Sequence, residues 1–161
     1  YSLLVDNNSG VLSRISGLFT RRGYNIDSIT AGVTADPRFT RITIVSSGDE
    51  IILSQIEKQI AKLEDVIVVK VLKPEESVYR ELILVKIRAN AQQRSEIVSI
   101  ADIFRAKIVD AERESLVIEL TGTQSKLEAF LQLLDGYEIL ELARTGIAGL
   151  SRGIKDVTFI E

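Results

Sequence analysis

Apolar and polar residues alternate along the chain in blocks that predict strands and helices in turn. Residues 1–5 are almost wholly apolar and predict a strand. The next block has apolar residues at i, i+1, i+4, i+7 and i+8, which form one stripe on a helix: Val11, Leu12, Ile15, Leu18 and Phe19. Gly23 follows this stripe, where a glycine commonly ends a helix.

The pattern then predicts two strands, a helix and another strand. Residues 26–33 and 41–44 alternate between apolar and polar side chains, as strands do, and a turn signal at Asp36 and Pro37 separates them. Residues 52–63 have helical apolar spacing, and residues 66–72 are nearly continuous in apolar side chains. The predicted order is strand, helix, strand, strand, helix, strand.

The second half of the chain repeats this order without visibly repeating the residues. The polar, proline-containing stretch KPEES, at 73–77, is the best linker candidate. The predicted elements after it are strand 81–87, helix 97–104, strands 107–112 and 115–120, helix 127–134 and strand 138–143. Ser125 and Glu128 have the spacing of a capping box for the last helix. We therefore expect a first domain over 1–73, a linker over 74–79 and a second domain over 80–161.

Two such units predict an α+β protein made of two ferredoxin-like (βαββαβ) domains, each with an antiparallel sheet and both helices on one face. Right-handed crossovers give the strand order 4-1-3-2 within each domain. The strand over 26–33 then lies at a sheet edge. An uncovered edge can pair with a second copy of the chain, so we expect a homodimer.

Composition narrows the possible functions. The 161 residues include no cysteine and no histidine, so the usual general base, thiol nucleophile and transition-metal ligands are missing. A formal net charge of −3 disfavours a general nucleic-acid binder. No apolar run approaches the length of a membrane span. With no disulfide framework and no secretory signal, we expect a cytoplasmic protein.

The stretch DNNSG, at residues 6–10, joins the first strand to the first helix and is the main candidate site. The start of a helix presents unpaired amide groups and a partial positive charge, which together favour an anion. Gly10 would let a ligand approach the backbone, and Ser9 can cap the helix. Amide oxygens of Asn7, Asn8 and Asn25 could accept hydrogen bonds from an ammonium group, which would complete a site for an α-amino acid. The alternative is that DNNSG is only a turn and a helix cap.

Two other patterns are weaker. Asp110, Glu112 and Glu114 alternate in sequence and could hold a hard cation, but a solvated strand edge is the favoured interpretation. The glycine-rich tail at 143–153, ARTGIAGLSRG, lacks the spacing of a phosphate-binding loop, and we expect an ordinary loop there.

The chain resembles the regulatory (small) subunits of acetolactate synthase, also called acetohydroxyacid synthase. The resemblance rests on NNSGVLSRISGLFTRRGYNIDSIT and continues through QIEKQIAKLEDV, RELILVKI, IFRAKIVD and LARTGIAGLSRG. The N-terminal half of these subunits is an ACT domain, a module that senses amino acids. The resemblance therefore implies a non-catalytic chain that binds the catalytic (large) subunit, activates it and transmits feedback inhibition in branched-chain amino acid biosynthesis.

The same resemblance implies where the effector binds. In this family valine lies at the interface of two ACT domains, with its carboxylate on the glycine loop and its ammonium near asparagines. The positions that match are, from one copy, Asn7, Asn8, Ser9, Gly10, Val11 and Leu12 and, from the other, Tyr24, Asn25 and Ile26. The family commonly has an acidic residue at the position of Asn8. Thiamine diphosphate, Mg and FAD are expected only on the catalytic subunit, with no metal on this chain.

Two other functions remain open at this stage. The first is a stand-alone ACT protein that regulates another enzyme or a transcription factor. The second is a ferredoxin-like adaptor that binds no small ligand.

Overall fold

The computed structural model describes residues 1–154 and 157, and these residues form two compact units. One unit comprises Tyr1–Tyr79 together with the described residues from Ile147 to Ile154, and the other comprises Arg80–Gly146. The predicted second domain covered residues 80–161. In the structure, residues 147–154 group with the first unit instead.

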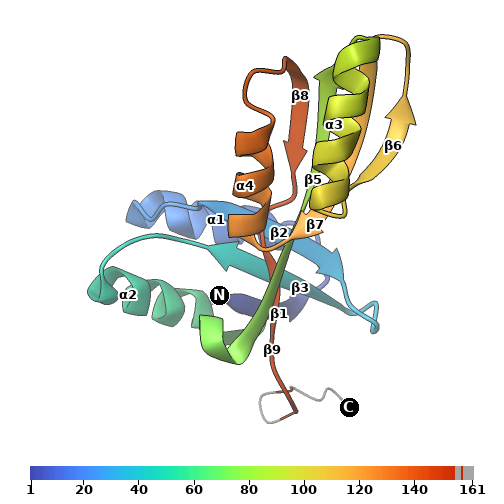
Figure 1. Ribbon diagram of the computed structural model, residues 1–161. Helices are drawn as coiled ribbons and strands as arrows, with labels where there is room; N and C mark the ends of the chain where they lie inside the picture. Colours follow the sequence, from blue (N-terminus) through green and yellow to red (C-terminus); the bar gives the residue numbers. More distant parts are fainter. Residues whose placement is uncertain (155–156, 158–161) are drawn as a thin grey trace. The chain divides into compact units, whose positions relative to one another are not determined.

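The first unit has the predicted ferredoxin-like order (Figure 1). Its elements are β1 (Ser2–Asp6), α1 (Val11–Arg22), β2 (Ser28–Val33), β3 (Phe39–Val45), α2 (Glu50–Ala61) and β4 (Val66–Lys70). The strands form an antiparallel sheet in the order β2-β3-β1-β4, which confirms the predicted order and places β2 at an edge.

One face of this sheet carries the core of the first unit. Side chains from β1 and β3 pack against α1 and α2 in a single cluster, so both helices lie on that face (Figure 1). The apolar stripe of α1 supplies buried Val11, Ile15, Leu18 and Phe19. Gly23 ends α1 with φ of 69°, as the sequence predicts. The core therefore fixes α1 against the sheet and with it the loop at its start.

The predicted linker is partly ordered, and the glycine-rich tail returns to the first unit. Pro74–Glu76 form a short 3₁₀ helix (η1), and the tail forms β9 (Ala148–Ser151), which pairs with β5, the strand that follows η1. The expected loop in the tail is thus wrong over these residues. A Cβ at Gly149 would lie 2.8 Å from the ring of Tyr79 and 2.9 Å from Leu72, so only glycine fits this close approach.

The second unit repeats the fold with its own core. Its elements are β5 (Ser77–Arg88), α3 (Ala91–Ile103), β6 (Lys107–Ala111), β7 (Ser115–Gly122), α4 (Gln124–Leu133) and β8 (Ile139–Arg144). The strand order β6-β7-β5-β8 matches the prediction. Ile83 of β5 and Ile118 of β7 belong to one buried cluster with residues of both helices, such as Ile97 of α3 and Phe130 of α4.

Two polar details of the second unit were not predicted. The N-cap of α4 is Thr123, whose hydroxyl accepts from the amide of Lys126, so the capping box expected at Ser125 and Glu128 is wrong. Glu81 is 6 % exposed and accepts two hydrogen bonds from the guanidinium of Arg144, at 2.9 and 3.0 Å. This bidentate pair joins β5 to β8 and compensates a buried carboxylate.

Candidate functional site

The loop between β1 and α1 lines a cavity of about 240 Å³ in the first unit. Six of the nine predicted effector residues border it together: Asn7, Asn8, Ser9, Gly10, Val11 and Leu12. The rest of the lining comes from the end of β1 and from β3: Val5, Asp6, Thr40 and Ile42. Leu12 is 49 % exposed at the first turn of α1, so it offers an apolar contact surface beside the loop.

The first turn of α1 has no side-chain cap. Gly10 is the N-cap residue, with φ of 85° in the left-handed region, and no side chain bonds to the amides of the first turn. The cap predicted at Ser9 is therefore wrong, because the chain enters the helix one residue later. No acidic side chain lies in this turn either. The partial positive charge at the start of α1 is left for a ligand.

Asn7 fixes the loop to the turn that precedes β3. Its side-chain amide donates to the carbonyl of Pro37 at 3.0 Å, and its side-chain oxygen accepts from Thr40 Oγ1 at 3.1 Å. Its backbone amide donates to the carbonyl of Arg38 at 2.8 Å. Asn7 thus holds the shape of the loop, and its oxygen already has a donor within the chain.

A second group of polar side chains fixes the other side of the loop. Arg14 Nε donates to Asp65 Oδ2 at 2.6 Å, and the guanidinium lies beside Gly10, whose added Cβ would be 3.0 Å from Arg14 Nη1. The bond from Arg14, and with a smaller effect one from Asn8, holds the pKa of Asp65 below its usual value. Sequence reasoning missed Arg14 and Asp65; the only signal was a cation four residues after Gly10.

The remaining three predicted residues lie at the far end of α1. Tyr24, Asn25 and Ile26 follow the C-terminal end of this twelve-residue helix, which is about 18 Å long at 1.5 Å per residue. The side-chain NH₂ of Asn25 donates to Asp27, and its backbone carbonyl accepts from Ser46 Oγ, which leaves the side-chain oxygen Oδ1 as an acceptor. A single copy therefore does not bring the two predicted halves of the site together.

The edge strand β2 leads away from these three residues. Ile29 is 37 % exposed and Val33 is 60 % exposed, and β3 is the one strand among the described residues that pairs with β2. An edge with exposed apolar side chains is suited to pairing with another strand.

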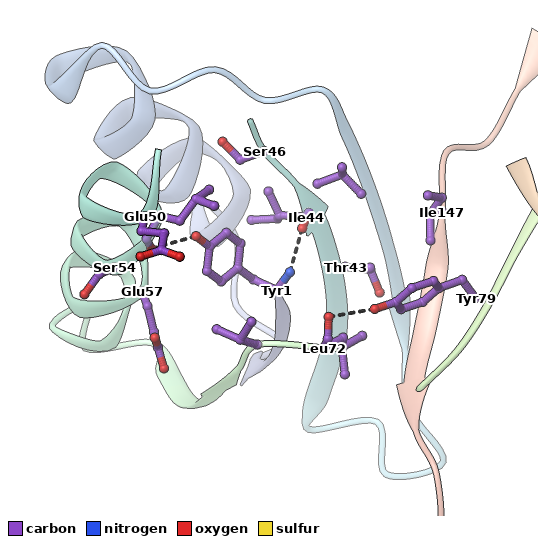
Figure 2. Close-up of a pocket in the computed structure, with 13 residues that line it drawn as sticks. Tyr1, Thr43, Ile44, Ser46, Glu50, Ser54, Glu57, Leu72, Tyr79 and Ile147 are labelled. Carbon is purple, nitrogen blue, oxygen red and sulfur yellow. Dashed lines mark hydrogen bonds between the residues drawn. The ribbon is translucent and has the colours of Figure 1, made fainter. Parts of the chain in front are cut away.

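A larger cavity, of about 450 Å³, lies elsewhere in the first unit (Figure 2). Tyr1, whose backbone pairs with that of Ile44, lines it together with the end of β3, one side of α2 and residues 71–72. None of the predicted effector residues lines it. It is therefore not the amino-acid site that the sequence predicts.

Two further expectations concern metals and membranes. Within residues 1–154 and 157, no group of three or more acidic, histidine or cysteine side chains is arranged to hold a metal ion. Because β6 ends at Ala111, Glu112 and Glu114 do not continue its face. No helix in the described part of the chain has the length and hydropathy needed to cross a membrane.

Comparison with known protein families decides the relationship. The family model for the AHAS small subunit-like ACT domain matches residues 1–68, and the model for the small subunit of acetolactate synthase matches residues 80–153. The chain belongs to the acetolactate synthase small-subunit family. Individual members of this family are similar in sequence to this chain over nearly their whole length.

Two curated relatives and one solved structure illustrate this similarity. The acetolactate synthase isozyme 3 small subunit of Escherichia coli is 48 % identical over 155 residues, covering 96 % of this chain and 95 % of the relative. The acetolactate synthase small subunit of Mycolicibacterium smegmatis is 46 % identical over 156 residues, which cover 97 % of this chain and 92 % of the relative. The crystal structure of the acetolactate synthase small subunit from Thermotoga maritima superposes with a TM-score of 0.88 at 43 % identity, covering 95 % of this chain and 96 % of that structure.

Proposed function

We propose that this chain is the regulatory subunit of an acetolactate synthase, which binds and activates the catalytic subunit and makes it sensitive to valine. Family membership over nearly the whole chain supports this role. The catalytic subunit carries the chemistry and its cofactors, thiamine diphosphate, Mg and FAD. This chain supplies the sensor.

In this proposal, valine binds between two copies that pair through β2. Its carboxylate accepts hydrogen bonds from the open amides at the start of α1. Its ammonium donates to the side-chain oxygen of Asn25 from the second copy. The single observation that carries the site is the uncapped, left-handed start of α1 at Gly10, beside a cavity of about 240 Å³.

Feedback inhibition then requires only that valine bind one state of the dimer more tightly than another. A coupling free energy of about 1 to 3 kcal/mol is typical of such regulation. The loop is suited to this role because valine in the shared site would contact both copies. Ordering the two copies around one ligand changes how they present their surfaces to the catalytic subunit.

The test combines two measurements on the full chain. Adding it to a purified catalytic subunit should raise the rate of acetolactate formation, and valine should then lower that rate. Calorimetric titration of the chain alone with valine should release or absorb heat. Valine binding without any effect on the catalytic subunit would instead identify a stand-alone regulator, and the absence of both effects would identify an adaptor without a ligand.

A further inference from the structure

The outer edge of the second sheet has features that distinguish it from the other edge of the same unit. β6 is the terminal strand of the order β6-β7-β5-β8, and all five of its residues are exposed (Figure 1). Ile108 and Val109 are 36 % and 50 % exposed. The strand occupies the place in this sheet that β2 occupies in the first sheet.

A β-bulge places the two charged residues of β6 on the same face. Lys107 pairs with Glu119 and Asp110 pairs with Val117, with a register shift between Ile108 and Asp110. Glu119 and Val117 are two residues apart on β7, so their side chains and those of Lys107 and Asp110 point to one side. In a regular strand, positions 107 and 110 would point to opposite sides.

This arrangement is complementary to itself under two-fold symmetry. In an antiparallel pair of β6 strands centred between Ile108 and Val109, Lys107 of each copy lies opposite Asp110 of the other. Residues that pair directly across an antiparallel ladder share a face, and the bulge satisfies this condition. Each interface then contains two Lys107–Asp110 pairs, and Ile108 of each copy faces Val109 of the other.

Within the described part of the chain, the charges on β6 are not held in ion pairs, although the charge of Asp110 contributes to the raised pKa of Lys86. Among the described residues, neither Lys107 nor Asp110 takes part in an ion pair. On the opposite edge, Glu141 of β8 is already paired with Lys86 at 2.8 Å, and Arg144 of β8 is paired with Glu81. Lysine and a bulge often protect an edge from pairing. Here the bulge aligns opposite charges instead.

We infer that β6 is a second interface between copies of this chain, in which two β6 strands pair antiparallel with Lys107 opposite Asp110. The occupant of this edge is therefore a second copy. This interface is separate from the proposed pairing through β2. It requires no ligand.

Disulfide trapping tests the register directly, because the chain contains no cysteine of its own. An equimolar mixture of the Lys107→Cys and Asp110→Cys variants of the full chain should form disulfide-linked dimers faster than either variant alone. A mixture of Leu140→Cys and Ala143→Cys, with the same spacing on β8, is the matched control and should cross-link slowly. Faster trapping on β8 than on β6 would overturn the inference.

Charge exchange tests the same contact without cysteine, in a Val33→Lys background that weakens pairing through β2. Lys107→Asp or Asp110→Lys alone should weaken self-association about tenfold, because like charges then face each other. The double variant restores opposite charges and should recover the association measured by sedimentation. A double variant no better than the single ones would refute the pairing.

A third outcome would assign this edge to another protein. If the single charge variants lose affinity for the catalytic subunit while their self-association is unchanged, the partner of β6 is that subunit and the inference is overturned. Thermal unfolding of each variant provides the folding control. All of these positions are exposed, so substitution should change stability little.

Discussion

Replacing Gly10 with aspartate should strongly weaken valine binding while leaving the fold intact. The backbone at Gly10 is left-handed, with φ of 85°, and aspartate is among the few other residues that visit this region readily. At an N-cap position its carboxylate can also accept from the amides of the first turn. The new side chain would therefore occupy the place proposed for the carboxylate of valine.

The expected loss of affinity has two components. Valine would lose its favourable interaction with the start of α1, about 0.3 to 2 kcal/mol. Two carboxylates about 4 Å apart also repel each other by about 1 kcal/mol in bulk water and by about 4 kcal/mol near a protein surface. Because the loop is exposed, a total of about 2 to 4 kcal/mol is reasonable, which raises the Kd for valine by about 30-fold to 1,000-fold.

Gly10→Asn is the matched control because it has the same shape without the charge. Calorimetric titration with valine should show a much larger loss for the aspartate variant than for the asparagine variant. Both variants should be destabilised to a similar extent, because each places a side chain at a left-handed φ beside Arg14, and both should keep their association with the catalytic subunit. If the two variants bound valine equally well, within about threefold, the charge at this loop would have no role and the carboxylate must bind elsewhere.

Four further substitutions test other parts of the structure. Asn25→Ala should weaken valine binding by about 1 to 3 kcal/mol, measured by calorimetry, because the ammonium loses an acceptor; unchanged affinity would point to backbone carbonyls instead. Val33→Lys should weaken dimerisation in sedimentation experiments, since this side chain is 60 % exposed on the edge strand, whereas an unaltered dimer would remove β2 from the interface. Asp65 has a lowered pKa in the folded protein, so its ion pair stabilises the fold above its usual pKa of 3.8 and this stabilisation is lost as the pH falls through the lowered value. The difference in unfolding free energy between wild type and Asp65→Asn should therefore shrink below about pH 4, and a constant difference would contradict the assignment. Arg144→Gln should lower the unfolding free energy by about 2 to 3 kcal/mol in urea titrations, because it leaves Glu81 buried without its cation, and an effect near zero would show that water replaces the guanidinium.

The sequence predicted the architecture well because its periodicities are strong. The stripe from Val11 to Phe19 could only be a helix with one buried face, and the strand order followed from the handedness of crossovers. The loop of the candidate site was found for the same reason, since it lies at the seam between two clear elements.

Other features depend on contacts between distant residues and could not be read from local patterns. The bond between Arg14 and Asp65 joins residues 51 positions apart. The cap at Ser9 failed because the entry of the chain into the helix is set by the left-handed turn at Gly10. The strand formed by Ala148–Ser151 was missed because three glycines in eleven residues indicate a loop, and only the contact with Tyr79 explains why a glycine is required.

The return of β9 to the first unit makes residues 80–146 a covalent insertion within it. Tyr79 and Ile147, the residues that flank this insertion, line the same cavity. A fragment cut at a single point after residue 79 would lack a native strand and expose the surfaces that Gly149 covers. To isolate the first unit, residue 79 should instead be joined to residue 147 by a short peptide linker. Residues 80–146 could then be exchanged for another domain without removing any strand of the first unit.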